Sequence, residues 1–145
     1  MRPRRVSRTM HRPIYGLEEA EQTEHDRIAR GVVLAALAVH RAVGPGLLES
    51  VYQTCLAHKL RSEGFTVDRE VAIPLEFEGV RLDLAVRADL VVNGIVIVEL
   101  KSVDSIVGVH RAQLMTQLRL SGRRLGLLIN FNEELLRNGI ERFAM

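Results

Sequence analysis

Apolar residues recur along the chain with two different periods, and the change of period divides it into elements. Residues 26–43 place apolar side chains three and four positions apart, which predicts a helix. Gly44-Pro45-Gly46 ends this pattern, because proline cannot continue a helix. A second helix is predicted over 47–62, with Gly64 as its C-terminal stop. Residues 16–25 are polar and acidic, which favours a loop or a frayed helix start.

Beyond Phe65 the pattern becomes typical of strands, with one more helix among them. Strands are predicted over 66–77, 80–86, 86–92, 95–101 and 125–131, a helix over 106–121, and a helical turn with an edge strand over 133–145. Turn signals at Glu78-Gly79 and Asn93-Gly94 separate the first strands. The order α-α-β-β-β-α-β predicts one α/β domain.

Composition narrows the class of protein. The 145 residues suit a single domain. The single cysteine, Cys55, excludes a disulfide scaffold, and no Cys/His spacing resembles a zinc finger, so we expect a cytoplasmic protein. No apolar run reaches the roughly 18 residues of a membrane span, so a membrane partner is not expected.

The charge is unevenly distributed. The sequence pI is 9.1, but residues 1–12 carry five arginines and no acid, whereas 13–145 hold 15 basic and 18 acidic residues. Basic N-terminal runs are usually solvated. We therefore expect residues 1–23 to form a flexible tail and 24–145 to form the domain, and Met10 is an alternative start.

The most informative residues are Asp89, Glu99 and Lys101, which stand among Val, Ile and Leu in two adjacent predicted strands. Such strands are buried on both faces and lie at the centre of a sheet. An ionised group there costs several kcal/mol to desolvate unless it is paired or bound to metal. Lys101 is also one of only two lysines beside 18 arginines, which favours a need for a compact ammonium group.

The register of the hairpin decides whether these groups meet. If Asn93-Gly94 alone formed the loop, Asp89 would point away from Glu99 and Lys101. If residues 92–94 formed a three-residue loop with a bulge, Asp89 would share their face. Two carboxylates there would make an oxygen site for Mg²⁺, or for Mn²⁺, which resembles it in its preference for oxygen ligands. The alternative is a buried ion pair that serves only the fold, but such a pair leaves one carboxylate over.

A third acid, Glu49, lines up with Tyr52, Leu56 and Leu60 at helical spacing, which predicts a place on the apolar stripe and a third metal-binding carboxylate. The alternative is a first-turn glutamate favoured by the helix dipole. Tyr52 and His40 are expected to be core residues whose polar atoms are hydrogen-bonded.

The helix after Lys101 is basic, since residues 105–132 contain no acid. Its candidate substrate contacts are His110, Arg111, Gln113, Gln117 and Arg119. Such groups beside a metal site suit a phosphodiester, because they position the backbone. The equal alternative is a solvated helix face with arginines answering the dipole.

Several separate blocks resemble one family. Gly46-Leu47-Leu48-Glu49-Ser50-Val51-Tyr52 is the spacing that names the GxxExxY proteins, and Glu99-Leu100-Lys101 and Leu127-Leu128-Ile129-Asn130-Phe131 are also similar to that family. The resemblance extends over about residues 24–143. It implies the PD-(D/E)XK nuclease-like superfamily, with a restriction-endonuclease-like α-β-β-β-α-β core, a central mixed sheet and, here, an extra N-terminal helix.

The resemblance also implies roles for individual residues. Asp89 and Glu99 would bind Mg²⁺, Lys101 would assist the attacking water and Glu49 would supplement the metal site. Related proteins carry a Gln and a Tyr four residues apart on the helix after the lysine. Here Gln113 matches, whereas Gln117 stands at the tyrosine position.

The combined expectation is a Mg²⁺-dependent nuclease that cuts DNA or RNA by metal-assisted attack of water. The alternative is a non-catalytic nucleic-acid-binding or assembly module that keeps the fold. A homodimer would suit a small protein that cuts both strands of a duplex.

Overall fold

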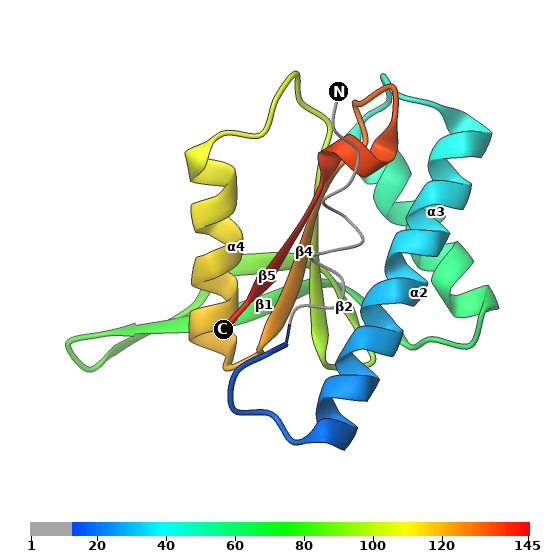
Figure 1. The fold of residues 1–145 in the computed structure, drawn as a ribbon. Helices are drawn as coiled ribbons and strands as arrows, with labels where there is room; N and C mark the ends of the chain where they lie inside the picture. Colours follow the sequence, from blue (N-terminus) through cyan, green and yellow to red (C-terminus); the bar gives the residue numbers. More distant parts are fainter. Residues whose placement is uncertain (1–12) are drawn as a thin grey trace.

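The computed structural model describes residues 13–145, except for the side chain of Ala85. The arginine-rich segment of the predicted tail lies outside the described residues. The domain has three layers: two helices cover one face of a sheet, and a third helix covers the other face (Figure 1). The α/β class predicted from the order of elements is confirmed.

The helices are α2 (Glu19–Val43), α3 (Glu49–Ser62), α4 (Gly108–Ser121) and the short 3₁₀ helix η1 (Leu136–Gly139). α2 starts seven residues before the predicted start at Asp26. The Glu18 N–H donates to Glu21 Oε2 (3.1 Å), and acids in the first turn answer the helix dipole. Residues 19–23, assigned from sequence to the tail, are therefore helical.

The strands are β1 (Val67–Phe77), β2 (Val80–Val92), β3 (Val96–Lys101), β4 (Leu125–Asn130) and β5 (Ile140–Ala144). They form one five-stranded sheet in the order β1-β2-β3-β4-β5. β3 and β4 are parallel and the other neighbours are antiparallel, so the sheet is mixed, as predicted. β3, which carries Glu99 and Lys101, is its central strand.

Hydrophobic burial on both faces holds β3 in place. Val98 and Leu100 belong to the core under α2 and α3, whereas Ile97 belongs to the core under α4, with Leu114 and Leu118. Because side chains alternate along a strand, Glu99 lies on the same face as Ile97, toward α4. Full burial of each such apolar side chain contributes about 1.5–3 kcal/mol.

The β2–β3 turn differs in detail from the predicted loop at 92–94. Asn93 (φ 54°) and Gly94 (φ 67°) are left-handed, and the Ile95 N–H donates to Val92 O (3.0 Å). Val92 pairs with Val96, so the three-residue loop comprises 93–95 and lies one residue later than predicted. The buried Val92 stays in the ladder and Ile95 becomes the extra residue. Moving the loop by one residue changes the partner of each β2 residue by two positions on β3. Asp89 therefore still shares a face with Glu99 and Lys101, as predicted.

β2 is one continuous strand rather than two. Its first half pairs with β1 alone, and the two strands extend together beyond the body as an arm (Figure 1). Leu82 pairs with Leu75, whereas the next pair is Val86 with Ile73, so the register shifts between them. The second half of β2 returns to the body and carries Asp89.

Candidate active site

Asp89 and Glu99 oppose each other where the β2–β3 ladder ends. The last pair of the ladder is Leu90 with Val98, which places Asp89 across from Glu99. Beyond it the carboxylates take over from backbone carbonyls: Asp89 Oδ2 accepts the Leu100 N–H (2.8 Å), and Glu99 Oε1 accepts the Asp89 N–H (3.4 Å). Each acid is therefore tied to the other strand, which fixes both side chains at one end of the β2–β3 ladder.

Burial makes it costly for both neighbouring acids to carry a negative charge. The Glu99 side chain is 8% exposed. Burial, aided by the nearby charge of Asp89, raises the pKa of Glu99 to about 8, and burial also raises the pKa of Asp89. A hydrogen bond between the two carboxyl groups counteracts this rise for Asp89. Two buried carboxylates so close cannot both ionise easily, so without a cation Glu99 retains its proton near neutral pH.

Lys101 lies beside this pair without neutralising it. Its Nζ is 4.0 Å from Glu99 Oε2 and donates to Gln113 Oε1 at 3.0 Å, and its side chain is 15% exposed. The 4.0 Å separation is long for a charge-assisted hydrogen bond. The pair also leaves the carboxylate of Asp89 without a lysine. A purely structural ion pair therefore does not account for all three groups.

A cavity of about 380 Å³ opens between α4 and this end of the sheet. Its walls are formed by Val86, Arg87, Glu99, Lys101, Val109, Ala112, Gln113, Thr116 and Gln117. Gln117 is 2% exposed, donates from Nε2 to Arg87 O (3.3 Å) and has no hydrogen-bond partner at Oε1. The structure therefore brings both predicted glutamines to the acids and the lysine.

The three basic residues predicted on α4 do not line this cavity. His110 Nδ1 accepts the Val107 N–H (3.0 Å) and caps the start of α4. Arg111 makes two hydrogen bonds to Glu141 of β5, at 2.8 and 3.0 Å. Arg119 is exposed near the other end of α4. Sequence spacing placed all three on one helix but could not say which side faces β3.

Glu49 is exposed, so its predicted place on the buried stripe is wrong. Tyr52, Leu56 and Leu60 are fully buried, but α3 begins at Glu49, where the first turn projects past the core. Glu49 Oε1 accepts the N–H of Ser102 (3.4 Å), directly after Lys101, and its charge contributes to the raised pKa of Asp89. Glu49 therefore lies at the margin of the site.

The loop before Glu49 is held by Tyr52. Its hydroxyl donates to Gly44 O (2.6 Å) and accepts the Leu47 N–H (3.1 Å), and its ring stacks on Phe131 with centroids 4.4 Å apart. Ser102 Oγ donates to Leu47 O (2.6 Å), which joins the loop to the end of β3. The predicted core role of Tyr52 is confirmed.

His40 is half-buried rather than part of the core, and its predicted hydrogen bond to the backbone is confirmed. Its Nε2 lies 2.6 Å from Glu133 O, and its ring lies near Phe131. A histidine on the apolar stripe of α2 is therefore satisfied by a backbone carbonyl.

Two residues near Asp89 escaped the sequence analysis. Gln53, 6% exposed, donates from Nε2 to Glu70 Oε1 (2.8 Å) and to Asp89 O (3.3 Å). Glu70 is left-handed (φ 52°) on the strand next to Asp89, and its charge also raises the pKa of Asp89. The position of Gln53 directly after buried Tyr52 was an available signal, whereas nothing in the sequence predicts a left-handed glutamate.

The donor set suits a small hard cation. Asp89 and Glu99 supply carboxylate oxygens, and the unpartnered Oε1 of Gln117 lines the same cavity as Glu99. Mg²⁺ uses one or two carboxylates and keeps several waters, so this set fits it. Residues 13–145 contain no group of three or more His, Cys, Asp or Glu side chains placed to hold a metal, so Glu49 does not join the other two acids in one ligand cluster.

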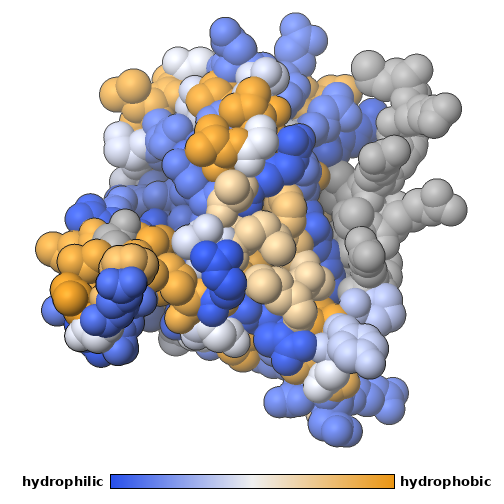
Figure 2. All heavy atoms as spheres, turned by 90° about the vertical axis from the view of Figure 1, so that its left-hand side faces the viewer, coloured by the Kyte–Doolittle hydropathy of each residue, from blue (hydrophilic) through white to orange (hydrophobic). Residues whose placement is uncertain are grey.

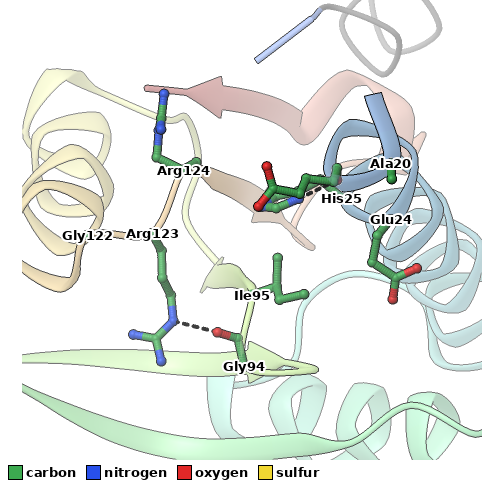
Figure 3. Close-up of a pocket in the computed structure, with 9 residues that line it drawn as sticks. Ala20, Glu24, His25, Gly94, Ile95, Gly122, Arg123 and Arg124 are labelled. Atoms are coloured by element: carbon green, nitrogen blue, oxygen red, sulfur yellow. Dashed lines mark hydrogen bonds between the residues drawn. The ribbon is translucent and has the colours of Figure 1, made fainter. Parts of the chain in front are cut away.

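A larger cavity, of about 470 Å³, lies at the opposite end of β3 (Figure 3). Its arginines are engaged by the backbone: Arg123 Nε donates to Gly94 O (3.1 Å), and Arg124 Nε donates to Met145 O (2.6 Å). Its Glu24 is paired with Arg27 (2.8 Å). These groups already have structural partners, so the smaller cavity is the candidate site.

Comparison with known proteins identifies the superfamily to which the chain belongs. Residues 26–143 match the family model of the PD-(D/E)XK nuclease superfamily, and the chain belongs to this family. The match supports a nuclease-like function and a nucleic-acid substrate, and nucleases of this superfamily typically depend on divalent metal ions. No curated protein and no solved structure matches the chain. In residues 13–145, no helix has the length and apolar character needed to cross a membrane.

The superfamily and the restriction-endonuclease-like fold predicted from sequence are thus confirmed. The predicted core order corresponds to α3-β1-β2-β3-α4-β4, and α2 is the extra N-terminal helix. The narrower resemblance to GxxExxY proteins stays a prediction.

Proposed function

We propose that this member of the PD-(D/E)XK superfamily is a Mg²⁺-dependent nuclease that hydrolyses phosphodiester bonds of DNA or RNA. The observation that carries the proposal is the opposition of Asp89 and Glu99 in a buried position beside Lys101. Two neighbouring carboxylates that destabilise each other, of which Glu99 lines a cavity, suit a bound cation better than an empty site. We expect a reducing cytoplasm as its location, since Cys55 is free.

In this proposal Asp89 and Glu99 hold the metal ion. When bound, the ion supplies Lewis-acid polarisation of the phosphate and lowers the pKa of a coordinated water. The N–H groups of Leu100 and Asp89 keep the two carboxylates oriented. Gln117, which hydrogen-bonds Glu99, favours the ionised form of that carboxyl group by lowering its pKa.

Lys101 is the group proposed to act on the substrate. Its Nζ would donate to negative charge that develops on the phosphate, which is worth more in a partly dry cavity than in water. The 3.0 Å hydrogen bond that Nζ donates to Gln113 Oε1 holds the ammonium group over the cavity. The exposed Arg87 at the cavity wall would position a flanking phosphate.

The test is Mg²⁺-dependent cleavage of single- and double-stranded DNA and RNA by the full chain. Lys101→Ala and Asp89→Asn should each lower the rate by about 10²-fold or more, because each removes a group used in the transition state. Two matched controls should retain the rate: Lys59→Ala, the other lysine, and Asp68→Asn, an exposed aspartate on β1.

Two results would contradict the proposal. Cleavage that persists in both site variants would mean a contaminant or another site. Nucleic-acid binding without cleavage under any condition would favour the non-catalytic binding module instead.

A further inference from the structure

The arm formed by β1 and β2 carries an apolar face that nothing in the described chain covers. Phe77, Val80, Leu82 and Leu84 are 64%, 58%, 46% and 76% exposed. Pairing of Phe77 with Val80 and of Leu75 with Leu82 places these side chains on one side of the arm. The arm extends away from the body (Figure 1), and hydrophobic atoms gather on it (Figure 2).

One edge of this arm is also unpaired. β3 pairs with β2 only from Leu90 onward, so the outer edge of residues 80–88 has no strand neighbour among the described residues. The register shift leaves residues 83–85 opposite Pro74 alone, which has no N–H to donate. An open apolar edge of this kind is a template for pairing with another strand. The outer edge of β1 is blunted by Pro74 and the left-handed Glu70.

The open edge is complementary to itself. It reads Val80-Arg81-Leu82-Asp83-Leu84. In an antiparallel pair of two copies centred on Leu82, Arg81 of each chain faces Asp83 of the other, and Val80 faces Leu84. Opposite charges directly across a strand pair are stabilising, as are apolar pairs.

The backbone N–H and C=O groups of this edge point in the direction that the pairing needs. The two-residue turn at Glu78-Gly79 makes Val80 and Phe77 a hydrogen-bonded pair. Because hydrogen-bonding groups alternate in direction along a strand, those of Arg81 and Asp83 face the open edge. These are the residues that face each other in the centred register. We propose that this chain forms a two-fold homodimer by antiparallel pairing of residues 80–84 of β2 with the same residues of a second copy.

Nucleic acid is a poorer occupant of the arm. Residues 75–84 hold Glu76, Glu78 and Asp83 against Arg81 alone, so phosphate is repelled. The dimer does not depend on nuclease activity, and its tests measure mass and cross-linking.

Charge reversal tests the register in sedimentation velocity runs over a concentration series. The wild-type chain should dimerise, and Arg81→Asp should weaken dimerisation by about tenfold or more, because two like-charged pairs then face each other. Asp83→Arg should do the same. The double reversal, Arg81→Asp with Asp83→Arg, should restore the dimer, since opposite charges again face each other.

The arm also contains an internal ion pair, with Arg81 Nε 2.6 Å from Asp83 Oδ1. The single reversals break this pair as well, whereas the double reversal keeps it in the opposite sense. Thermal unfolding of each variant therefore accompanies the mass measurement and separates loss of the dimer from loss of the fold.

Cross-linking gives a second, independent readout in a Cys55→Ala background. Leu82→Cys places two thiols across the two-fold axis, where facing Cβ atoms lie about 4.5–5.5 Å apart, so oxidation should yield a disulfide dimer. Leu84→Cys is the matched control, because its two copies are four positions out of register and should stay unlinked.

Several results would overturn the proposal. These are a wild-type chain that stays monomeric over the whole series, a dimer that Arg81→Asp leaves intact, and equal cross-linking of the two cysteine variants. A dimer that the double reversal fails to restore would likewise overturn this register.

Discussion

The two ends of β3 each border a cavity, and the two cavities differ in what their ionisable groups do. At the Gly94 end, the arginines donate to backbone carbonyls and Glu24 has an arginine partner. At the Lys101 end, Asp89 and Glu99 face each other across a strand pair, and burial raises the pKa values of both. The larger cavity is therefore the one that lacks a pair of carboxylates facing each other.

The difference shows that buried charged groups without neutralising partners identify a candidate site better than the volume of a cavity does. Satisfied charges stabilise or leave the fold unchanged, whereas each buried charge without a partner costs several kcal/mol. Two leucines opposite each other would fit a central strand better than Asp89 and Glu99. A chain that keeps the acids retains a destabilising arrangement, which protonation of Glu99 relieves and which, in our proposal, a bound cation offsets.

The largest expected effect is on the cleavage rate, when the glutamate at the Lys101 end is neutralised and the glutamate at the Gly94 end serves as the control. Glu99→Gln should lower Mg²⁺-dependent cleavage by about 10²-fold or more, because even partners of metal ligands cost 10–100-fold when removed. Glu24→Gln, the same change in the larger cavity, should leave the rate unchanged. Single-turnover rates of both variants make the comparison, and equal loss in both would erase the distinction between the two ends.

The pH dependence of stability should come from the Lys101 end. The pKa of Glu99 rises from its ordinary 4.5 to about 8 on folding. The folded chain therefore keeps a proton that the unfolded chain releases, and this stabilisation is complete below pH 4.5 and lost as pH rises toward 8. In EDTA, the free energy of unfolding should fall by up to about 1.4 kcal/mol per pH unit in this window.

Urea unfolding at a series of pH values measures this slope. Glu99→Gln should flatten it, whereas Glu24→Gln should not. Because metal ligands must be deprotonated, Mg²⁺ should raise the midpoint more at high pH than at low pH. A wild-type slope that persists in Glu99→Gln would assign the proton to another group.

The smallest effect is expected from the larger cavity. Arg123→Ala removes the hydrogen bond to Gly94 O in the β2–β3 turn and should lower the free energy of unfolding by about 1 kcal/mol, without changing cleavage. Arg30→Ala, an exposed arginine on α2, is the control and should change neither. A loss of cleavage in Arg123→Ala would give the larger cavity a part in the chemistry.

The order of elements and the shared face of Asp89 and Glu99 were predictable because they depend on local patterns. The apolar residues around Glu99 predict a central strand, and the face of a strand follows from parity alone. The loop moved by one residue without changing parity, so the predicted meeting of the two acids was robust to that error.

The surroundings of the acids were not predictable, because they depend on contacts distant in sequence. Glu49 is exposed because α3 begins at this residue, where the first turn projects past the core. Helical spacing cannot show where a helix begins relative to the core. Glu70 acts on Asp89 through a left-handed backbone in a neighbouring strand. Arg111 is engaged by Glu141, thirty residues later in the chain.

The hydroxyl of Tyr52 gives the Gly46–Glu49–Tyr52 spacing a meaning distinct from catalysis. It donates to Gly44 O and accepts the Leu47 N–H in one loop, while the proposed reacting groups come from β2 and β3. The shape of the loop and the proposed chemistry therefore depend on different residues. A variant of this chain that kept Tyr52 but replaced Lys101 would retain the hydrogen bonds of this loop while losing the group proposed to act on the substrate.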